Sequence, residues 1–322
     1  MFRLRLQLLF VLSLLLVLPT NVSLAVADKK DKEIPKGTPV LWRRPVDIRS
    51  RDLRLGPGGA RMKPDFRRVT FVEEQKGGYS KKYKVRDASG REWVAKIGKE
   101  AQAETAAVRL LWALGYMTEI NYLSPTSEIV GKGIFHNVRF EARPENVKRL
   151  DEWKWTDNPF VGTQELRGLK VLMALINNWD IKDSNNQILL VRGENGNELR
   201  YIISDLGATF GKSGSTPIIW RFTRSRNKPN DYAKAEFVDT VVDNHVHFHY
   251  GSKRKDLFSD ITVEDATWIG GLLSQLSTQQ LRDAFRAANY SPAQLNLLVN
   301  EVRERTNELL RVGTDGRLGR RR

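Results

Sequence analysis

The 322-residue chain contains no cysteine. Disulfide bonds, cysteine-ligated zinc sites and thiol nucleophiles are therefore excluded. Acidic residues are scarce relative to basic ones, because 38 Asp and Glu face 53 Lys and Arg and leave a formal net charge of +15. This balance favours anionic partners such as nucleotides, nucleic acid or acidic surfaces without deciding among them. The hydrophobic content of 40% and the charged content of 28% indicate a globular protein of one large or two small domains.

Long hydrophobic runs are also absent, apart from one stretch near the N-terminus. The apolar run from Leu8 to Leu18 follows two arginines and precedes the small residues Ala25-Val26-Ala27. This pattern is typical of a signal peptide, and the run is shorter than the roughly 20 residues that a membrane-spanning helix needs. We therefore expect residues 1–27 to be a signal peptide, with no transmembrane segment left after its cleavage. An uncleaved signal anchor is the alternative.

Export and the absence of cysteine together indicate where the mature protein is located. Secreted animal proteins of this size usually carry disulfides, so a cysteine-free exported chain fits a bacterial periplasm better. We expect the mature protein to be periplasmic or secreted.

Two flanking segments differ in composition from the central part of the chain. Residues 28–65 are charged and rich in proline, which predicts an extended lead segment with little regular structure. Its Gly56-Pro57-Gly58-Gly59 run lacks the Lys-Ser/Thr ending of a phosphate-binding P-loop and predicts a turn. Residues 313–322 form a basic tail that we expect to be disordered. The domain itself is expected over residues 66–312.

The first part of this domain is rich in strand signals. Short runs of β-branched and aromatic residues predict three antiparallel strands, at 69–73, 82–86 and 92–97. A stretch rich in Ala, Leu and Glu, residues 100–114, predicts a helix that Gly115 ends. We place this N-lobe at about residues 66–125.

The second part of the domain carries mostly helical patterns. Apolar residues at helical spacing predict a helix over 163–177, and two short apolar runs predict a hairpin, at 187–191 and 199–203. Capping-box patterns begin two further helices near the C-terminus, at Ser277 and Ser291. The expected fold class is α+β and two-lobed, with a small antiparallel-sheet N-lobe and a mostly helical C-lobe at about residues 126–312.

Five residues in chain order supply the groups that phosphoryl transfer needs. They are Lys96 in the third strand, Glu104 on the next helix, and Asp180, Asn185 and Asp205 beyond the second helix. A strand lysine provides a fixed cation for phosphates, and a glutamate eight residues later can pair with it. An aspartate followed five positions later by an asparagine lets one loop present a base and a metal ligand. Asp205 then adds a second oxygen ligand of the kind that magnesium prefers.

Three of these pieces resemble motifs of protein kinases. Asp180, Lys182 and Asn185 match H-R-D-x-K-x-x-N from its aspartate onward, with Asn178-Trp179 in place of His-Arg. Asp205-Leu206-Gly207 resembles the magnesium-binding D-F-G, and Val94-Ala95-Lys96 resembles the V-A-I-K strand. The chain therefore resembles a divergent protein-kinase-like fold, of the kind that includes HipA-type, phosphoinositide and secretory-pathway kinases, as an exported bacterial member. It has no A-P-E motif.

The resemblance implies a role for each residue of the nucleotide site. Lys96, held by Glu104, would orient the α and β phosphates of ATP, while Asn185 and Asp205 would hold Mg²⁺. The run Gly77-Gly78-Tyr79-Ser80 stands where a phosphate-covering loop would lie, although it is not G-x-G-x-x-G. Its candidate phosphate contacts are Gly77, Gly78 and Ser80.

The same resemblance assigns the transfer chemistry to Asp180 and Lys182. Asp180 would orient and deprotonate the acceptor hydroxyl, and Lys182 would neutralise charge on the transferred γ-phosphoryl group. The expected function is ATP- and Mg-dependent phosphotransfer to an acceptor outside the cytoplasm. A protein, sugar, lipid or small molecule would serve equally, because fold resemblance does not fix the substrate.

Alternatives stay open at several residues and for the function. Glu100 or Glu92 could replace Glu104 as the partner of Lys96, and Asn186 could replace Asn185. A pseudokinase or scaffold with the same fold and no catalysis is the first alternative function, and a basic anion-binding protein is the second. No recognisable motif supports a specific nucleic-acid partner.

Three of the four histidines alternate along a predicted strand and would share one face of it. They are His245, His247 and His249. Their neighbours supply no spacing that completes a ligand set, so the pattern favours a polar strand face over a metal site.

Overall fold

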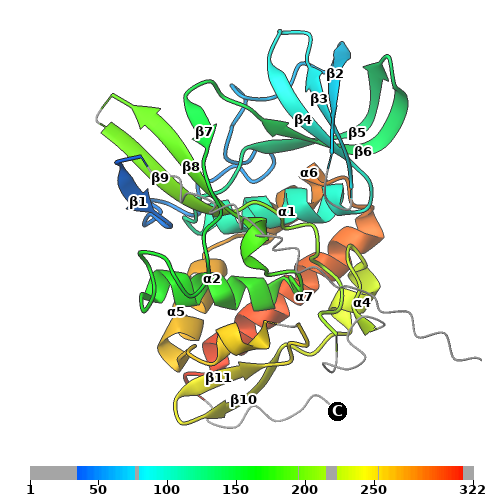
Figure 1. The fold of residues 1–322 in the computed structure, drawn as a ribbon. Coiled ribbons are helices and arrows are strands. Elements are labelled where there is room, and N and C mark those ends of the chain that lie inside the picture. Colours follow the sequence, from blue (N-terminus) through cyan, green and yellow to red (C-terminus); the bar gives the residue numbers. More distant parts are fainter. Residues whose placement is uncertain (1–34, 77–79, 195, 215–222, 253, 315–322) are drawn as a thin grey trace, which may run out of the picture. The chain divides into compact units, whose positions relative to one another are not determined.

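A closed five-stranded barrel forms the N-lobe in the computed structural model of the protein (Figure 1). The structure describes residues 35–76, 80–194, 196–214, 223–252 and 254–314, all within the unit Ile34–Arg322. The strands of the barrel follow the order β2-β3-β4-β6-β5. Their bounds are β2 (Val69–Gln75), β3 (Lys81–Arg86), β4 (Glu92–Ile97), β5 (Asn121–Val130) and β6 (Gly133–Ala142).

The barrel confirms the three predicted strands and adds two that the sequence patterns did not predict. Strands β2, β3 and β4 pair antiparallel, as expected. Strand β6 pairs with β4, and β5 closes the barrel through a parallel pairing with β2. Because β6 runs to Ala142, the barrel extends well past residue 125, where we had placed the end of the N-lobe.

Helix α1 (Glu100–Ala113) follows β4 and packs against β5 and β6 of the barrel and against α6 of the C-lobe. Twelve of its 14 residues are buried, because alanines let neighbours approach on more than one face. A helix covered on several sides is held in place by its surroundings more than by its own propensity. The position of α1 is therefore fixed by both lobes.

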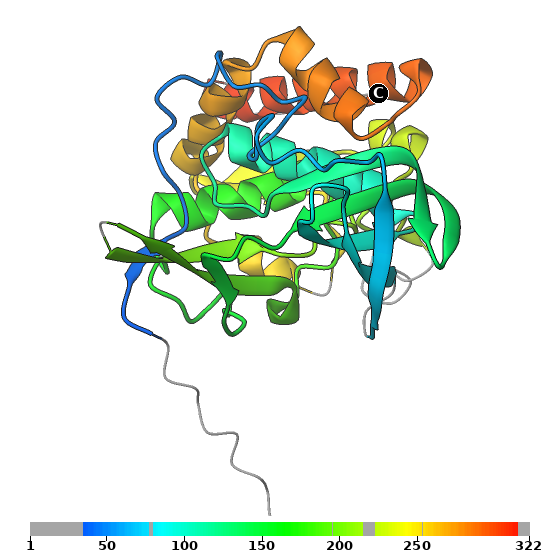
Figure 2. The same cartoon turned by 90° about the horizontal axis from the view of Figure 1, so that it is seen from above.

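The C-lobe combines a four-stranded sheet with a group of helices. Its sheet has the order β1-β9-β8-β7, from β1 (Thr38–Val40), β9 (Gly196–Ile203), β8 (Asn186–Gly193) and β7 (Val147–Arg149). Figure 2 shows this sheet beside the barrel. The helices are α2 (Gln164–Leu175), α4 (Pro229–Ala233), α5 (Val263–Ser274), α6 (Thr278–Ala287) and α7 (Pro292–Arg311), with the 3₁₀ turns η1 (Asp183–Asn185) and η2 (Lys255–Phe258).

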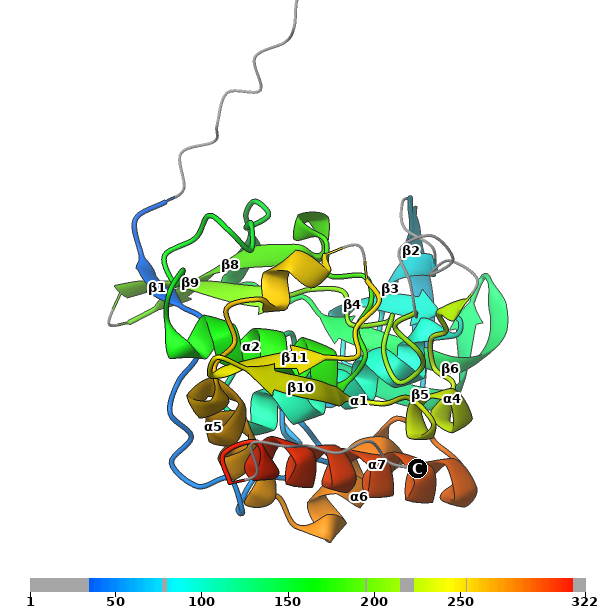
Figure 3. The same cartoon turned by 90° about the horizontal axis from the view of Figure 1, so that it is seen from below.

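Helix α7 is the central element of the helical part and contacts α4, α5 and α6. Ser277 and Ser291 begin α6 and α7 with complete capping boxes, as predicted. The hairpin of β10 (Val238–Val242) and β11 (His245–Phe248) lies beside α5 and α7 (Figure 3). The two-lobed α+β architecture is the predicted one. Among the described residues, no helix combines the length and apolar character needed to cross a membrane.

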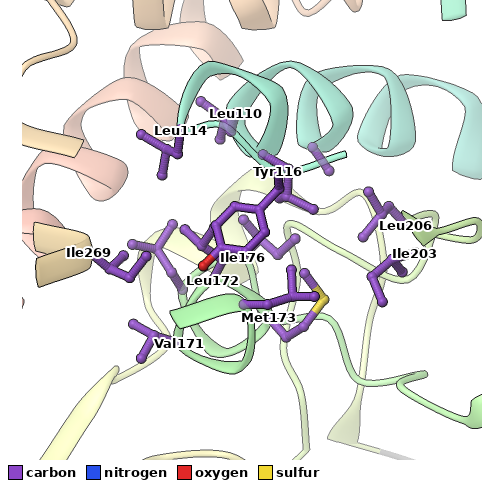
Figure 4. Close-up of a cluster of buried hydrophobic side chains, with 14 of the residues drawn as sticks. Leu110, Leu114, Tyr116, Val171, Leu172, Met173, Ile176, Ile203, Leu206 and Ile269 are labelled. Carbon is purple, nitrogen blue, oxygen red and sulfur yellow. The ribbon is translucent and has the colours of Figure 1, made fainter. Parts of the chain in front are cut away.

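The two lobes share a hydrophobic core between α1 and α2, shown in Figure 4. Leu110 and Leu114 come from α1 and its C-cap, and Leu172 and Ile176 come from α2 and its C-cap. Tyr116 lies between them, buried, and donates its hydroxyl to the carbonyl of Glu165 at the start of α2. This packing keeps α1 in register with the part of the C-lobe that carries Asp180 and Asp205.

The lead segment is built into this core. β1 pairs with β9 in parallel, and Leu41, Ile48 and Leu53 are buried. Backbone hydrogen bonds also join the segment to the residues after α1, from Arg43 N to Gly115 O and from Met117 N to Leu41 O. Within residues 35–65, the described part of the segment, regular structure is limited to the three residues of β1, so its contacts with the rest of the protein hold it in place. The predicted signal peptide 1–27, Gly77, Gly78 and residues 315–322 of the basic tail lie outside the described residues.

Candidate functional site

Lys96 is a buried cation at the centre of the candidate site. Its Nζ lies 2.9 Å from Glu104 Oε2, 2.9 Å from Glu100 Oε2 and 3.3 Å from Asp205 Oδ1. The side chain is 2% exposed. Burial by itself would lower the pKa of Lys96, but Glu104, Asp205 and Glu100 outweigh it and raise that pKa above its usual value. Lys96 is therefore charged at every physiological pH.

Helix α1 supplies two carboxylates to Lys96. Glu100 and Glu104 lie one turn apart on α1 and reach the same ammonium group, so two of the open alternatives occur together. Glu92 is excluded as a partner, since it pairs with Lys84 and Arg86. Burial, together with the nearby Asp205, raises the pKa of Glu104 although Arg139 and Lys96 oppose the shift. For Glu100 burial is outweighed, chiefly by Lys96, and the pKa is lowered.

Glu100 also joins the site to two other segments. Ser80, just before β3, donates its hydroxyl to Glu100 Oε2 at 2.7 Å, and Arg226 forms an ion pair with Glu100 Oε1. Of the predicted phosphate-loop residues, Ser80 is the one that the structure describes, and it is held against α1. Ser80 and Arg226 thus converge on the first turn of the helix.

Asp205 lies two residues after the end of β9 and faces Lys96. Its Oδ1 accepts a hydrogen bond from the backbone N–H of Gly207 at 3.0 Å. Burial would raise the pKa of Asp205, but Lys96 and this N–H lower it below its usual value. The side chain is 35% exposed, so the carboxylate remains within reach of a ligand.

Asn185 and Asp205, the two predicted metal ligands, lie next to each other. The backbone carbonyl of Asn185 accepts the N–H groups of Ser204, at 2.7 Å, and of Asp205, at 3.3 Å. Its side-chain Nδ2 donates a hydrogen bond to the carbonyl of Asp180 at 2.5 Å. The side-chain oxygen Oδ1 therefore remains as a ligand for a cation. Asn186 instead donates to the carbonyl of Trp153 and is buried in the core.

Asp180 and Lys182 are the exposed part of the site. Lys182 Nζ lies 3.3 Å from Asp180 Oδ2, and the two side chains are 57% and 34% exposed. The loop that carries them is fixed by its backbone: the Asp180 N–H donates to Asn178 Oδ1, and the 3₁₀ turn η1 leads on to Asn185. An exposed carboxylate on a rigid loop is suited to contact with a substrate hydroxyl.

Trp179 packs under this loop rather than presenting an open face. It is buried, donates its indole N–H to the carbonyl of Ser225, and lies against the guanidinium groups of Arg224 and Arg226 at 4.1 and 4.6 Å from its ring centre. Ser252 donates its hydroxyl to the Trp179 carbonyl. These contacts tie the Asp180 loop to the segments around residues 225 and 252.

The residues around the site fit ATP and Mg²⁺. Magnesium takes oxygen ligands and needs few from the protein, and Asn185 and Asp205 provide an amide oxygen and a carboxylate on adjoining backbone. Lys96 provides a fixed cation. Within the described ranges no cluster of three or more His, Cys, Asp or Glu is suited to a transition metal. His249 pairs with Glu236 and Asp239, and His245 bonds to the Asp243 carbonyl.

Sequence reasoning missed a second layer behind Lys96, made of four charged residues and one serine. These residues are Arg139, Glu141, Arg149, Glu119 and Ser204. Arg139 is the direct neighbour of Lys96 across the β4–β6 pairing, and Glu141 lies two residues further on the same face. Alternating charges on β6 would have been a signal if the strand itself had been recognised.

The chain combines a five-stranded barrel, a helix that pairs with a strand lysine, and a helical lobe that carries Asp180 and Asp205. This arrangement is a divergent kinase-like fold, as predicted. No protein-family model matches the chain, and no curated protein matches it significantly.

Solved structures of kinases show low-level similarity to the chain. The Helicobacter pylori proinflammatory kinase CtkA aligns with 14% identity and a TM-score of 0.46, over 76% of this chain and 95% of its own. The Rio2 kinase of Chaetomium thermophilum, in a complex with ADP/Mg²⁺ and phosphoaspartate, aligns with 13% identity and a TM-score of 0.31, over 78% and 74%. Fam20 of hydra, in a structure with sugar, aligns with 11% identity and a TM-score of 0.32, over 79% of this chain and 89% of its own. At these values the likeness says nothing about the reaction.

Proposed function

We propose that this protein is an ATP- and Mg²⁺-dependent phosphotransferase that acts on an acceptor hydroxyl outside the cytoplasm. The observation that carries the proposal is the position of Lys96, which contacts Glu104 of the N-lobe and Asp205 of the C-lobe at the same time. A cation held by an acid on one side and a candidate metal ligand on the other is the arrangement that phosphoryl transfer needs.

The buried residues of the site bind and orient the nucleotide in this proposal. Lys96 is fixed by its carboxylates before any ligand arrives, so it loses little entropy on contact with the α and β phosphates. Asn185 and Asp205 hold Mg²⁺, which when bound neutralises charge on the phosphate oxygens. Ser80, held at Glu100, is placed to contact the phosphates.

The exposed residues act on the acceptor. Asp180 accepts a hydrogen bond from the acceptor hydroxyl and takes its proton as the oxygen attacks the γ-phosphorus. Lys182, 3.3 Å from Asp180, is exposed enough to turn toward the transferred phosphoryl group and offset its charge. The proton moves from the acceptor oxygen to Asp180, and ADP is the leaving group.

The compartment is proposed from the sequence pattern of residues 1–27, which lies outside the described residues. The acceptor class is left open within the proposal. A hydroxyl on a protein, sugar, lipid or small molecule meets the chemical requirement.

The proposal is tested by ADP formation from ATP and Mg²⁺ by residues 28–322, with water and the chain itself as acceptors. We expect Asp205→Asn to reduce the rate at least a hundredfold. Glu198→Gln is the matched control, because Glu198 lies on β9, the strand that leads to Asp205, and pairs with Arg43 and Arg200 instead. An equal rate for Asp205→Asn and the parent would contradict the assignment, and nucleotide binding without any turnover would support the scaffold alternative.

A further inference from the structure

A chain of buried ion pairs leads from the back of Lys96 across the N-lobe. Glu104 uses Oε2 for Lys96 and Oε1 for Arg139, whose Nη1 lies 2.5 Å away. Arg139 in turn reaches Glu141 Oε2 through Nη2, at 2.6 Å. All four side chains are at most 5% exposed. Buried charges are tolerated only when they are paired, so the members of this chain depend on one another.

Arg149 on β7 connects this series of ion pairs to the residue before Asp205. Its Nη1 lies 3.2 Å from Glu141 Oε1 and also pairs with Glu119 Oε1. Its Nη2 donates to the hydroxyl of Ser204 at 2.6 Å, and that hydroxyl donates to Glu119 at 3.2 Å. Ser204 directly precedes Asp205. The contacts therefore form a closed path that begins and ends at Lys96.

Ser204 is the point where this path meets both candidate metal ligands. Its backbone N–H donates to the carbonyl of Asn185 at 2.7 Å, and the next residue is Asp205. Its side-chain hydroxyl accepts a hydrogen bond from Arg149. A guanidinium bonds two groups in a fixed planar geometry, so Arg149 sets the position of Ser204 relative to Glu141 and Glu119.

We propose that Arg149 is a positioning residue for the magnesium site, acting through the Ser204 hydroxyl on Asn185 and Asp205. This inference rests on the proposed function, because it concerns the same metal ligands. Outer groups that orient metal ligands typically contribute 10- to 100-fold to metal affinity. Loss of the Arg149–Ser204 hydrogen bond should therefore lower the affinity for Mg²⁺ and raise the Mg²⁺ concentration that nucleotide binding requires, without changing the binding of metal-free ATP.

The test is a magnesium titration of the ATP-dependent rise in melting temperature of residues 28–322. ATP is held at one concentration, so its own chelation of Mg²⁺ is the same for every variant. We expect Ser204→Ala to raise the half-maximal Mg²⁺ concentration about tenfold or more, and Ser204→Thr, which keeps the hydroxyl, to restore it. Arg149→Lys keeps the charge beside Glu141 but loses the fork, and should shift the midpoint in the same direction.

Two further measurements separate positioning from simple stabilisation. Arg143→Lys is the matched control, because Arg143 pairs with the same Glu141 and makes no contact with Ser204 among the described residues. It should leave the magnesium midpoint unchanged. The double variant Arg149→Lys/Ser204→Ala should shift the midpoint no further than Ser204→Ala alone. Each substitution removes the same Arg149–Ser204 hydrogen bond, so the second has nothing more to remove.

The outcomes are distinct for the two proposals. If the parent shows a magnesium-dependent rise and Ser204→Ala has the parent's midpoint, the positioning role is overturned while the proposed function stands. If the parent itself shows no magnesium-dependent rise, both are overturned. Additive midpoint shifts in the double variant would also contradict a route through Ser204.

Discussion

Gly207 lies so close to Glu100 that a Cβ added to the glycine would be 2.6 Å from the Glu100 Cβ. The glycine follows Asp205 and Leu206, and Glu100 is one of the carboxylates that hold Lys96. The contact therefore ties the spacing of the Asp-Leu-Gly motif to the first turn of α1. Glycine is required here for close approach, since any side chain would enter the space of the helix.

Gly207→Ala should destabilise the protein and weaken ATP binding together. Overpacking of this kind typically costs about 1–3 kcal/mol in the free energy of unfolding. Urea denaturation measures the first effect, and the ATP-dependent rise in melting temperature measures the second. Gly271→Ala on α5 is the control: a Cβ there meets nothing within 4 Å, so alanine should be neutral or stabilising. Equal behaviour of the two variants would contradict the steric account.

Lys96→Met should be among the most destabilising single changes in the N-lobe. It leaves Glu100, Glu104 and Asp205 without their shared cation, and removal of one partner from a buried ion pair typically costs about 3–5 kcal/mol. Lys84→Met on the adjacent strand is the matched control, because Lys84 pairs with Glu92 and both are partly exposed. We expect that control to cost about 1 kcal/mol or less in urea denaturation. A similar loss for both variants would refute the central place of Lys96.

The buried carboxyl of Glu119 predicts a pH dependence of stability. Burial, followed by the neighbouring Glu141, raises the pKa of Glu119 to about 7 from its ordinary 4.5, although Arg149 opposes the shift. Within the described residues its Oε2 has no hydrogen-bond partner. A raised carboxyl pKa means that the folded state binds the proton more tightly than the unfolded state. The stability that this group contributes is present below about pH 4.5 and is lost as the pH rises toward 7.

Glu119→Gln removes this titration. The free energy of unfolding of the parent, relative to that of the variant, should fall by roughly 1–3 kcal/mol between pH 5 and pH 8. Urea denaturation of both proteins at three pH values measures the difference. A parent that gains stability over the variant as the pH rises would contradict the predicted sign.

The lead segment should contribute to folding as much as elements of the domain proper. Ile48 is buried, and Gln280 at the start of α6 donates to its carbonyl at 2.8 Å. Ile48→Ala should cost about 2–4 kcal/mol in the free energy of unfolding. Val46→Ala, two residues away and fully exposed, should change it by less than about 0.5 kcal/mol. Near-equal effects would mean that the segment is not part of the core.

Much of the fold could be predicted because its first elements keep a regular pattern. Strands β2 to β4, α1, α2 and the β8–β9 hairpin all follow the expected periods. Strand β5 was missed because Pro125 interrupts it, and a proline argues against a strand interior. Strand β6 was missed because Arg139 and Glu141 occupy buried positions, where charged residues are rare.

The residues of the candidate site also divide into those that the sequence predicted and those that it did not. Lys96, Asp180, Asn185 and Asp205 were found from local spacing, because each lies in a short motif. The charges behind them come from segments far apart in the chain, and their contacts exist only after the barrel and the β7–β9 sheet have formed. Sequence spacing carries no information on such pairs, which is why Arg149 and Ser204 could not be predicted.

The most direct test of the nucleotide site is the melting temperature of residues 28–322 with ATP, in the presence and absence of Mg²⁺, for the parent and for Asp205→Asn. Ligand binding stabilises the folded state by RT ln(1 + [L]/Kd), or about 2.7 kcal/mol when ATP is at a hundred times its Kd. We predict a magnesium-dependent rise in the parent that Asp205→Asn loses. The same rise in both proteins, or none in either, would contradict the account of Lys96, Asn185 and Asp205 as a nucleotide and magnesium site.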